Sequence, residues 1–447
     1  MLIINAKIIT WERPNRILEG QAVYVQNGRI VAIDSQEKLL AAYKDSEVLD
    51  AGGQYLMPGL ICSHTHFYGA FSRGMAIPAD PPEAFPQILE RLWWPLDRSL
   101  TLEDIKYSAL VCLVDAIKHG TTTLIDHHAS PNAIEGSLDA VAEAVLQSGV
   151  RASLCYEVTD RNGLQQTKAG IDENVRFIEQ VKKDNGEGRL SATFGLHASL
   201  TLSEKTLEEC RKAVPDDVGF HIHVAEHVAD EYDSLKKTGL RVIDRLKRHG
   251  MLGSKSIAVH CVHVDAREIA YLAESRTWVS HQPRSNMNNA VGLPKVEDML
   301  RFGIRVCLGN DGFSNTMWEE WKTAYLAHKV WHLDPRRMNG MDVVNMAVYN
   351  NAALANTLFD SVRIGSIEIG SEADLILVDY HPITELDTGN LPWHILFGFH
   401  ESMVTTTIVR GKILMKDRKL ITLDEKGIAE HAVKLSRDVW KRYRALF

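Results

Sequence analysis

The chain has 447 residues, of which 45% are hydrophobic and 24% are charged, proportions that are ordinary for a soluble globular protein. Its 50 Lys and Arg against 58 Asp and Glu give a formal charge of −8, which excludes the basic footprint of a nucleic-acid binder. No apolar run approaches the ~20 residues of a membrane helix, and the first residues lack the pattern of a signal peptide. We therefore expect a cytoplasmic protein whose six scattered cysteines are free thiols.

Residues 1–57 carry short apolar runs separated by turn signals, among them Gln26-Asn27-Gly28 and Ala51-Gly52-Gly53. Such turns between strand-like runs are typical of β-hairpins. We expect this segment to form hairpins without a helical crossover.

Residues 58–364 alternate strand-like runs with amphipathic segments. The runs are short and rich in β-branched residues, as in buried parallel strands. The first long helix is predicted to begin at a capping box, Thr101 to Asp104, and to end near Gly120. Strand–helix alternation repeated eight times favours a (β/α)8 TIM barrel over an open sheet. The strand-like runs are 59–66, 121–128, 151–157, 191–197, 218–224, 256–260, 277–281 and 305–311, and the other helical segments are 135–148, 170–183, 203–213, 230–249, 265–274 and 295–302.

Residues 365–423 again have strand-like sequence. Neither this segment nor residues 1–57 is large enough to form a stable hydrophobic core by itself. We therefore expect an α/β protein in which the barrel of residues 58–364 carries one small β-sandwich domain built from both chain ends. Residues 424–447 are predicted to form a closing helix.

Ten of the 19 histidines fall at the carboxyl ends of the predicted strands. These ends meet on one face of a barrel, where the active sites of this fold lie. A single histidine at a strand end is usually structural, but ten that converge on one face indicate a functional cluster. They are His64, His66, His127, His128, His197, His221, His223, His260, His263 and His281.

His64 and His66 form the sharpest motif. Residues i and i+2 of a strand face the same side, so both imidazoles can reach one metal ion. On the fifth predicted strand, His221 and His223 share a face in the same way, and the spacing alone does not choose between them.

Five motifs together resemble the amidohydrolase superfamily over essentially the whole chain. They are PGLICSHTH at 58–66, HIHVAE at 221–226, AVHCVH at 258–263, SHQPRSNM at 280–287 and LGNDG at 308–312. Within that superfamily the chain is similar to the mononuclear deaminase and chlorohydrolase branch. The segments 92–98, 125–131, 159–163 and 284–292 resemble the SsnA-type aminohydrolases, which are associated with purine catabolism.

The resemblance implies a metal held by His64, His66, His223 and Asp311. His223 is preferred to His221 because Glu226 follows it three residues later, as in the family pattern. The binuclear branch has a lysine on strand four, whereas SATFGLHAS at 191–199 has none and ends near His197. We therefore expect one divalent metal per chain, with zinc as the default and iron(II) as the alternative, since imidazole and carboxylate suit both.

The same resemblance assigns the chemistry. A divalent metal lowers the pKa of a water molecule from 15.7 toward ~7, and Asp311 takes its proton as well as ligating the metal. Glu226 protonates a ring nitrogen and passes a proton to the leaving nitrogen, and His260 stabilises the developing charge. His263 is expected to be structural.

The substrate pocket is predicted from residues just beyond the strand ends. Polar contacts are expected from His127, His128, His197, Arg284 and Asn286, and stacking from Trp93 in the long Pro-rich stretch 67–100, where core packing is the competing interpretation. The absence of a phosphate-cradling glycine loop favours a base over a nucleotide.

The expected function is hydrolysis of a C–N bond, by deamination, in a purine-like or other nitrogen heterocycle, by a homodimer. A ring-opening cyclic amidohydrolase and a triazine-type chlorohydrolase are the alternatives. Halide departure does not need the proton donors Glu226 and His260, which disfavours the latter. A non-catalytic metal-binding protein is disfavoured because ligands and acid are all present.

Overall fold

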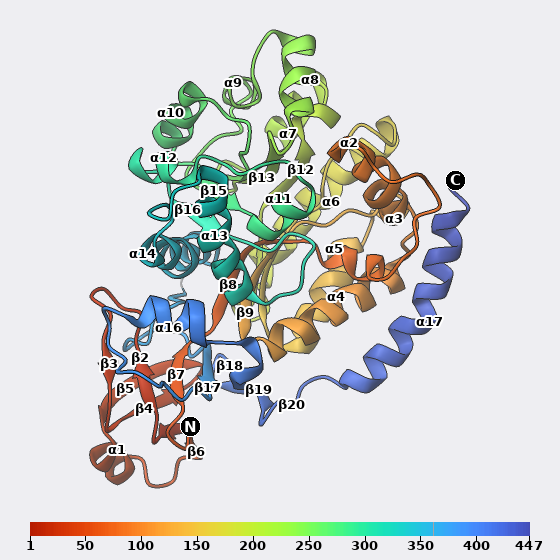
Figure 1. Ribbon diagram of the computed structural model, residues 1–447. Coiled ribbons are helices and arrows are strands. Elements are labelled where there is room, and N and C mark those ends of the chain that lie inside the picture. Colours follow the sequence, from red (N-terminus) through yellow and green to blue (C-terminus); the bar gives the residue numbers. More distant parts are fainter. Residues whose placement is uncertain (361) are drawn as a thin grey trace.

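All eight predicted strand runs form parallel strands in the computed structural model, which describes residues 1–360 and 362–447 (Figure 1). They lie in two sheets, with the orders β11-β10-β9-β8 and β12-β13-β14-β15-β16. The fourth run is divided between the two sheets at Thr193. The strands are β8 (Leu60–Thr65), β9 (Thr121–Asp126), β10 (Arg151–Leu154), β11 (Leu190–Ala192), β12 (Phe194–Ala198), β13 (Phe220–Val224), β14 (Ile257–His260), β15 (Trp278–His281) and β16 (Val306–Leu308).

Backbone bridges join the two sheets at both seams. Thr65 at the end of β8 pairs in parallel with Asp311 just beyond β16, and Val158 beyond β10 pairs with Leu196 in β12. The strand order therefore continues from the eighth strand back to the first, as the predicted barrel requires.

Helices follow the barrel strands, and most begin within a few residues of the predicted positions. The capping box at Thr101 and Asp104 is present at the start of α4. The predicted helix over 230–249 is two helices, because Gly239 adopts φ +71° and ends the first. The helices are α4 (Leu102–Lys118), α5 (Ser137–Ser148), α6 (Leu164–Lys183), α7 (Glu204–Ala213), α8 (Val228–Thr238), α9 (Val242–Arg248), α10 (Ala266–Ser275), α11 (Pro283–Asn288), α12 (Val296–Arg301), α13 (Met317–His332), α14 (Gly340–Val344), η4 (Asn345–Asn350), α15 (Asn351–Leu358) and α16 (Leu391–Gly398).

The two chain ends build the predicted sandwich. One sheet has the order β5-β4-β1-β6, and the other, β20-β19-β18-β17-β7-β2-β3, combines strands from both ends. Ile3 and Val23 of the first sheet share a buried core with Leu56 and Leu375 of the second. The strands are β1 (Leu2–Ile4), β2 (Lys7–Ile9), β3 (Ile17–Leu18), β4 (Gln21–Gln26), β5 (Arg29–Ser35), β6 (Val48–Asp50), β7 (Tyr55–Pro58), β17 (Leu375–Val378), β18 (Val404–Val409), β19 (Lys412–Lys416) and β20 (Lys419–Leu420).

The expectation that residues 1–57 lack a helical crossover is wrong. The Asn27-Gly28 turn does join the hairpin β4–β5, but α1 (Gln36–Ala42) follows, and β6 then pairs in parallel with β1. Parallel neighbours need a crossover connection rather than a tight turn. The run Gln36-Glu37-Lys38-Leu39 consists of good helix formers. This helix signal is short, and the turn signals on either side of it favoured hairpins instead.

One buried arginine ties the barrel to the sandwich. Arg151 at the start of β10 is fully buried, and its Nε donates to Asp374 Oδ2 at 2.6 Å while its Nη2 contacts Glu372. Both carboxylates immediately precede β17. The division of the chain at residues 57, 364 and 423 stays a prediction, supported by the change from sandwich strand β7 to barrel strand β8 at Gly59.

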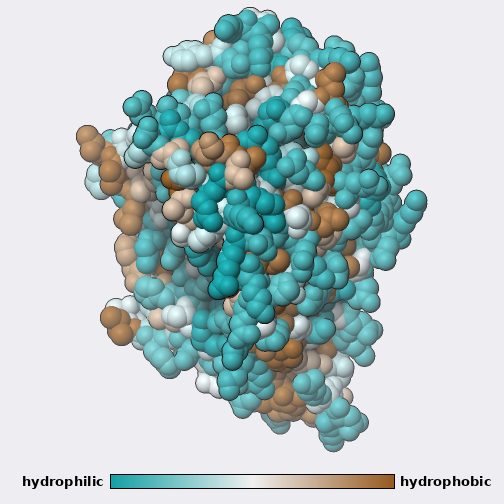
Figure 2. Space-filling model, turned by 90° about the vertical axis from the view of Figure 1, so that its right-hand side faces the viewer, coloured by the Kyte–Doolittle hydropathy of each residue, from teal (hydrophilic) through white to brown (hydrophobic). Residues whose placement is uncertain are grey.

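The predicted closing helix is α17 (Glu425–Arg444), which lies along α4 in Figure 1. Figure 2 views the molecule from this side and shows a mainly hydrophilic face with scattered hydrophobic residues. Within the described residues, no helix is both long enough and apolar enough to cross a membrane.

Candidate active site

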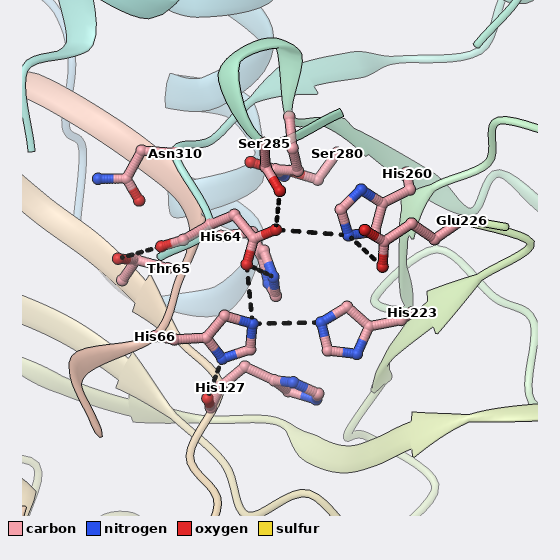
Figure 3. A network of polar contacts seen from close by, with 12 residues as sticks. His64, Thr65, His66, His127, His223, Glu226, His260, Ser280, Ser285 and Asn310 are labelled. Atoms are coloured by element: carbon pink, nitrogen blue, oxygen red, sulfur yellow. Dashed lines mark hydrogen bonds and ion pairs between the residues drawn. The ribbon is translucent and has the colours of Figure 1, made fainter. Parts of the chain in front are cut away.

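The ends of the first and eighth barrel strands place the His64-Thr65-His66 motif against Asp311. The Asp311 amide donates to the His64 carbonyl at 3.1 Å, and the His66 amide donates to the Asp311 carbonyl at 3.2 Å. The Thr65 hydroxyl also donates to that carbonyl, at 3.1 Å. The backbone therefore fixes the Asp311 carboxylate beside the imidazoles of His64 and His66, which Figure 3 labels.

Backbone carbonyls orient two of the three predicted ligand histidines. Nδ1 of His66 donates to the His127 carbonyl at 2.6 Å, and Nδ1 of His223 donates to the His197 carbonyl at 2.8 Å. Each Nε2 is thereby left for another partner. The two Nε2 atoms lie 3.3 Å apart, and that of His66 is 3.1 Å from Asp311 Oδ1.

The site fits a divalent metal. Nε2 of His64 is buried without a hydrogen-bond partner and lies 3.8 Å from Asp311 Oδ1. An imidazole nitrogen that nothing satisfies, beside two further nitrogens and a carboxylate, is the donor set that zinc or iron(II) takes. His221 lies behind this cluster, where its Nε2 is 2.9 Å from Nδ1 of His64, so it faces a ligand rather than the metal position.

Two carboxylates in the site have pKa values pushed in opposite directions. Burial and the charge of Asp311 raise the pKa of Glu226 well above its usual range. Burial disfavours charge on Asp311 too, but His66, His260 and His223 outweigh it and lower its pKa. Separated pKa values of this kind mark an acid and a base.

His260 lies between these two carboxylates. Its Nε2 is 3.4 Å from Glu226 Oε2 and 3.7 Å from Asp311 Oδ2, and burial lowers its pKa to about 4. Asn286 Nδ2 donates to Nδ1 of His260 at 3.0 Å, which leaves the proton of the neutral ring on Nε2, facing the carboxylates.

The backbone is strained at these positions. Ala225, His260, Cys261 and Asp311 all have positive φ, between 45° and 70°, a region that L-residues rarely adopt. Strain of this kind gathers at functional sites, where the surrounding structure holds it.

A cavity of about 470 Å³ opens onto this cluster. His66, His223, Glu226 and Asp311 line its floor, and among the predicted substrate contacts His197 and Trp93 line its wall. The stretch 67–100 contributes much of that wall through η1 (Phe67–Ser72), α2 (Phe85–Ile88), η2 (Leu89–Trp93) and α3 (Trp94–Arg98).

Helix α17 holds this wall from outside. Trp440 Nε1 donates to the Phe71 carbonyl at 2.8 Å, and Arg442 Nε donates to the Ser99 carbonyl at 2.6 Å. The Tyr443 hydroxyl donates to the Arg91 carbonyl. Three residues of one helix thus contact the beginning, middle and end of the wall segment.

The structure does not bring four of the predicted substrate contacts to the cavity. Arg284 is committed to Glu319 and Glu320 on α13, and Asn286 lies behind His260. His127 and His128 are fully buried outside the cavity lining. The direction of a side chain after a strand depends on the loop backbone, which sequence spacing does not reveal. His263 contacts the Val291 carbonyl at 3.1 Å, away from the site.

Glu157, which follows β10, is a site residue that the motifs described above do not include. It lines the cavity although only 3% of it is exposed. Its Oε1 lies 3.0 Å from His127 Nδ1 and 3.6 Å from His66 Nδ1. Burial opposes its charge, but His127 and His197 outweigh it and lower its pKa. A carboxylate directly after a buried strand is the signal that could have found it.

Comparison with known proteins adds a family and relatives. The profile of the Amidohydrolase family matches residues 55–414. A 5-methylthioadenosine/S-adenosylhomocysteine deaminase of Acetivibrio thermocellus is 32% identical over 98% of this chain and 99% of that protein. A 5'-deoxyadenosine deaminase of Methanosarcina barkeri is 31% identical over 100% of this chain and 99% of that deaminase. An adenosine deaminase from Xanthomonas campestris, solved with bound zinc, is 25% identical, with a TM-score of 0.84 over 98% of both chains.

Proposed function

Because the chain belongs to the amidohydrolase family, we propose that it is a metal-dependent aminohydrolase that deaminates a purine-like heterocycle. One observation carries the proposal. The imidazoles of His64, His66 and His223 converge on Asp311, while Glu226 with a raised pKa faces the same cavity. Full-length similarity to deaminases of adenine-containing compounds supports the choice of deamination.

We assign His64, His66, His223 and Asp311 as the metal ligands. The family is metal-dependent, and zinc is supported by this donor set and by the zinc-bound relative. When bound, the cation would polarise a water molecule and lower its pKa. One metal per chain follows from strand four, where β11 and β12 bring no lysine to the site.

The chain's own residues then handle the protons. The Asp311 carboxylate takes a proton from the attacking water, and Ser285, whose hydroxyl donates to Asp311 Oδ2 at 2.6 Å, holds that carboxylate in place. Glu226 gives its proton to a ring nitrogen of the substrate, takes up the proton of the added hydroxyl as the carbonyl forms, and passes it to the amino group, which leaves as ammonia. The proton that Asp311 took from water then restores Glu226. His260 stabilises the charge that develops on the added oxygen. A positioned acid or base typically contributes 10²–10⁴-fold to the rate.

The decisive experiment incubates zinc-loaded protein with a heterocycle panel and measures mass change and ammonia. The panel contains guanine, 8-oxoguanine, isoxanthopterin, urate and 5-methylthioadenosine, together with a chlorotriazine and an acyclic amide. Deamination replaces an amino group by oxygen and frees ammonia. Ring opening adds one water and frees none, whereas chloride release from a chlorotriazine identifies the chlorohydrolase alternative. Metal content is measured in parallel, and about one metal per chain is expected. Turnover of an acyclic amide alone would overturn the proposal.

The homodimer, the cytoplasmic location and the link to purine catabolism stay predictions. Gel filtration against standards of known mass tests the first, with a mass near twice 50.1 kDa expected.

A further inference from the structure

The cavity contains many carboxylates and no basic side chain other than histidine. None of the described residues that line it is a lysine or an arginine. The cations that pair with two of its acids, Arg161 with Asp97 and Lys237 with Asp233, lie outside the lining. The acidic lining residues are Glu90, Asp97, Glu157, Glu226, Asp230, Asp233 and Asp311. Such a wall attracts hydrogen-bond donors and repels substrate carboxylates and phosphates.

Glu157 has one oxygen left for a ligand. Its Oε1 is occupied by His127 Nδ1 at 3.0 Å. Among the described residues, no hydrogen bond reaches Oε2, and His197 Nε2 lies 4.0 Å from it. Because Glu157 lines the cavity, Oε2 is the acceptor that it presents there.

His197 presents a second acceptor beside it. The Thr201 hydroxyl donates its single proton to the Ala198 carbonyl at 3.1 Å and lies 2.8 Å from Nδ1 of His197. Nδ1 therefore carries the ring proton and donates to Thr201, which leaves a lone pair on Nε2. Two acceptors 4.0 Å apart thus face the same part of the cavity.

A second metal at Glu157 is the competing interpretation, since His66, His127, Glu157 and His223 lie close enough to share an ion. His127 argues against it. Its Nε2 contacts the His221 carbonyl at 3.0 Å and its Nδ1 lies 3.0 Å from Glu157 Oε1, so both ring nitrogens are already engaged within the protein.

We infer that Glu157 Oε2 and His197 Nε2 form an acceptor pair that recognises ring N–H groups, and that the substrate is an uncharged, N–H-rich lactam heterocycle. Oxidised purines and pterins carry such groups. The adenine of a nucleoside, whose N9 carries the sugar, offers only lone pairs on its ring nitrogens, and the acidic wall repels the phosphate of adenosine 5'-monophosphate. The inference rests on the proposed function only in taking this cavity as the substrate site.

The first test compares ligands on zinc-loaded wild-type protein by calorimetric titration. The expected order of affinity is 8-oxoguanine or isoxanthopterin first, 5-methylthioadenosine second and adenosine 5'-monophosphate last, with about tenfold or more between the first and the last. Tighter binding of either adenine compound than of the lactams overturns the inference. Binding in this order without ammonia release would instead overturn the proposed function alone.

The second test asks whether Glu157 accepts a hydrogen bond from an N–H group of the ligand. Binding of 8-oxoguanine is compared with that of its N1-, N7- and N9-methyl derivatives in wild type and in Glu157→Gln. One methylation should weaken wild-type binding about tenfold, and the variant should lose most of that discrimination because its amide presents a donor. A purely steric effect of the methyl group would persist in the variant, and equal discrimination in both proteins overturns the pairing.

Two further variants complete the test. Glu179→Gln makes the same chemical change at an exposed position on α6, and it should bind every ligand like wild type. If Glu157→Gln loses its metal through His127, Thr201→Val is tested in its place. That change removes the acceptor for His197 Nδ1–H, and among the described residues the Thr201 hydroxyl has no hydrogen bond to a proposed metal ligand. It should weaken lactam binding and leave 5-methylthioadenosine binding unaffected. Equal effects on both ligands would contradict the assignment.

Discussion

Glu226 is the residue whose replacement separates proton transfer from metal binding. In Glu226→Gln the amide keeps the shape of the side chain and has no transferable proton. We expect kcat to fall by about 10² or more, with metal content unchanged because Glu226 is outside the ligand set. Steady-state kinetics and elemental analysis measure both quantities. An unchanged kcat would mean that the raised pKa of Glu226 serves no catalytic step.

His66 predicts how metal affinity depends on pH. Burial opposes charge on this ring, but Asp311, Glu157 and the His127 carbonyl outweigh it and raise the pKa of His66 to about 9 in the metal-free protein. Below that pH a metal must displace a proton. We expect about one proton released per metal at pH 7, and an apparent affinity that falls about tenfold for each unit of decreasing pH.

Calorimetric titration of the metal in two buffers with different ionisation enthalpies measures this proton. His64 and His223 do not contribute, because burial lowers the pKa of both rings. Metal affinity that is flat between pH 6 and 8 would contradict the protonated state of His66.

At the scale of elements, the sequence predicted the barrel strands well and individual side-chain directions poorly. Parallel strands buried on both faces leave a strong pattern, and each of the eight runs overlaps a strand. The motif His64-Thr65-His66 is also readable, because alternation along a strand fixes which side chains share a face. Arg284 lies in the short helix α11 and His128 lies in the loop after β9, beyond the strands whose alternation could be read, and the structure turns both away from the cavity.

Helix α17 is expected to affect substrate binding indirectly, because it holds the cavity wall. The double variant Trp440→Phe and Tyr443→Phe keeps an aromatic ring at both positions and removes the two donors that hold Phe71 and Arg91. With ~0.5–1.5 kcal/mol for each of the two hydrogen bonds, the wall loses about 1–3 kcal/mol of support, and we expect KM to rise about fivefold or more while metal content stays constant. Lys434→Gln, exposed on the same helix, is the control and should keep wild-type KM. A lowered metal content in the double variant would show that α17 supports the barrel rather than the cavity wall.

At the scale of the whole molecule, Arg151 couples the barrel to the sandwich. Arg151→Met leaves the buried carboxylates of Asp374 and Glu372 without their main cation. Breaking a buried pair in this way costs about 3–5 kcal/mol, so we expect the free energy of unfolding in urea to fall by that amount. Arg151→Lys, which retains a charge, should lose less. Two separate unfolding transitions in wild type would contradict the coupling.

The contacts of α17 also set an order of events during protein synthesis. Every proposed metal ligand precedes β17 in the chain, so a nascent polypeptide can complete the metal cluster while α17 is still unmade. The wall segment 67–100 obtains its contacts with Trp440, Arg442 and Tyr443 only afterwards. A ribosome-bound intermediate should therefore hold zinc before it can select a substrate, and shaping the cavity becomes the late step in maturation of the enzyme.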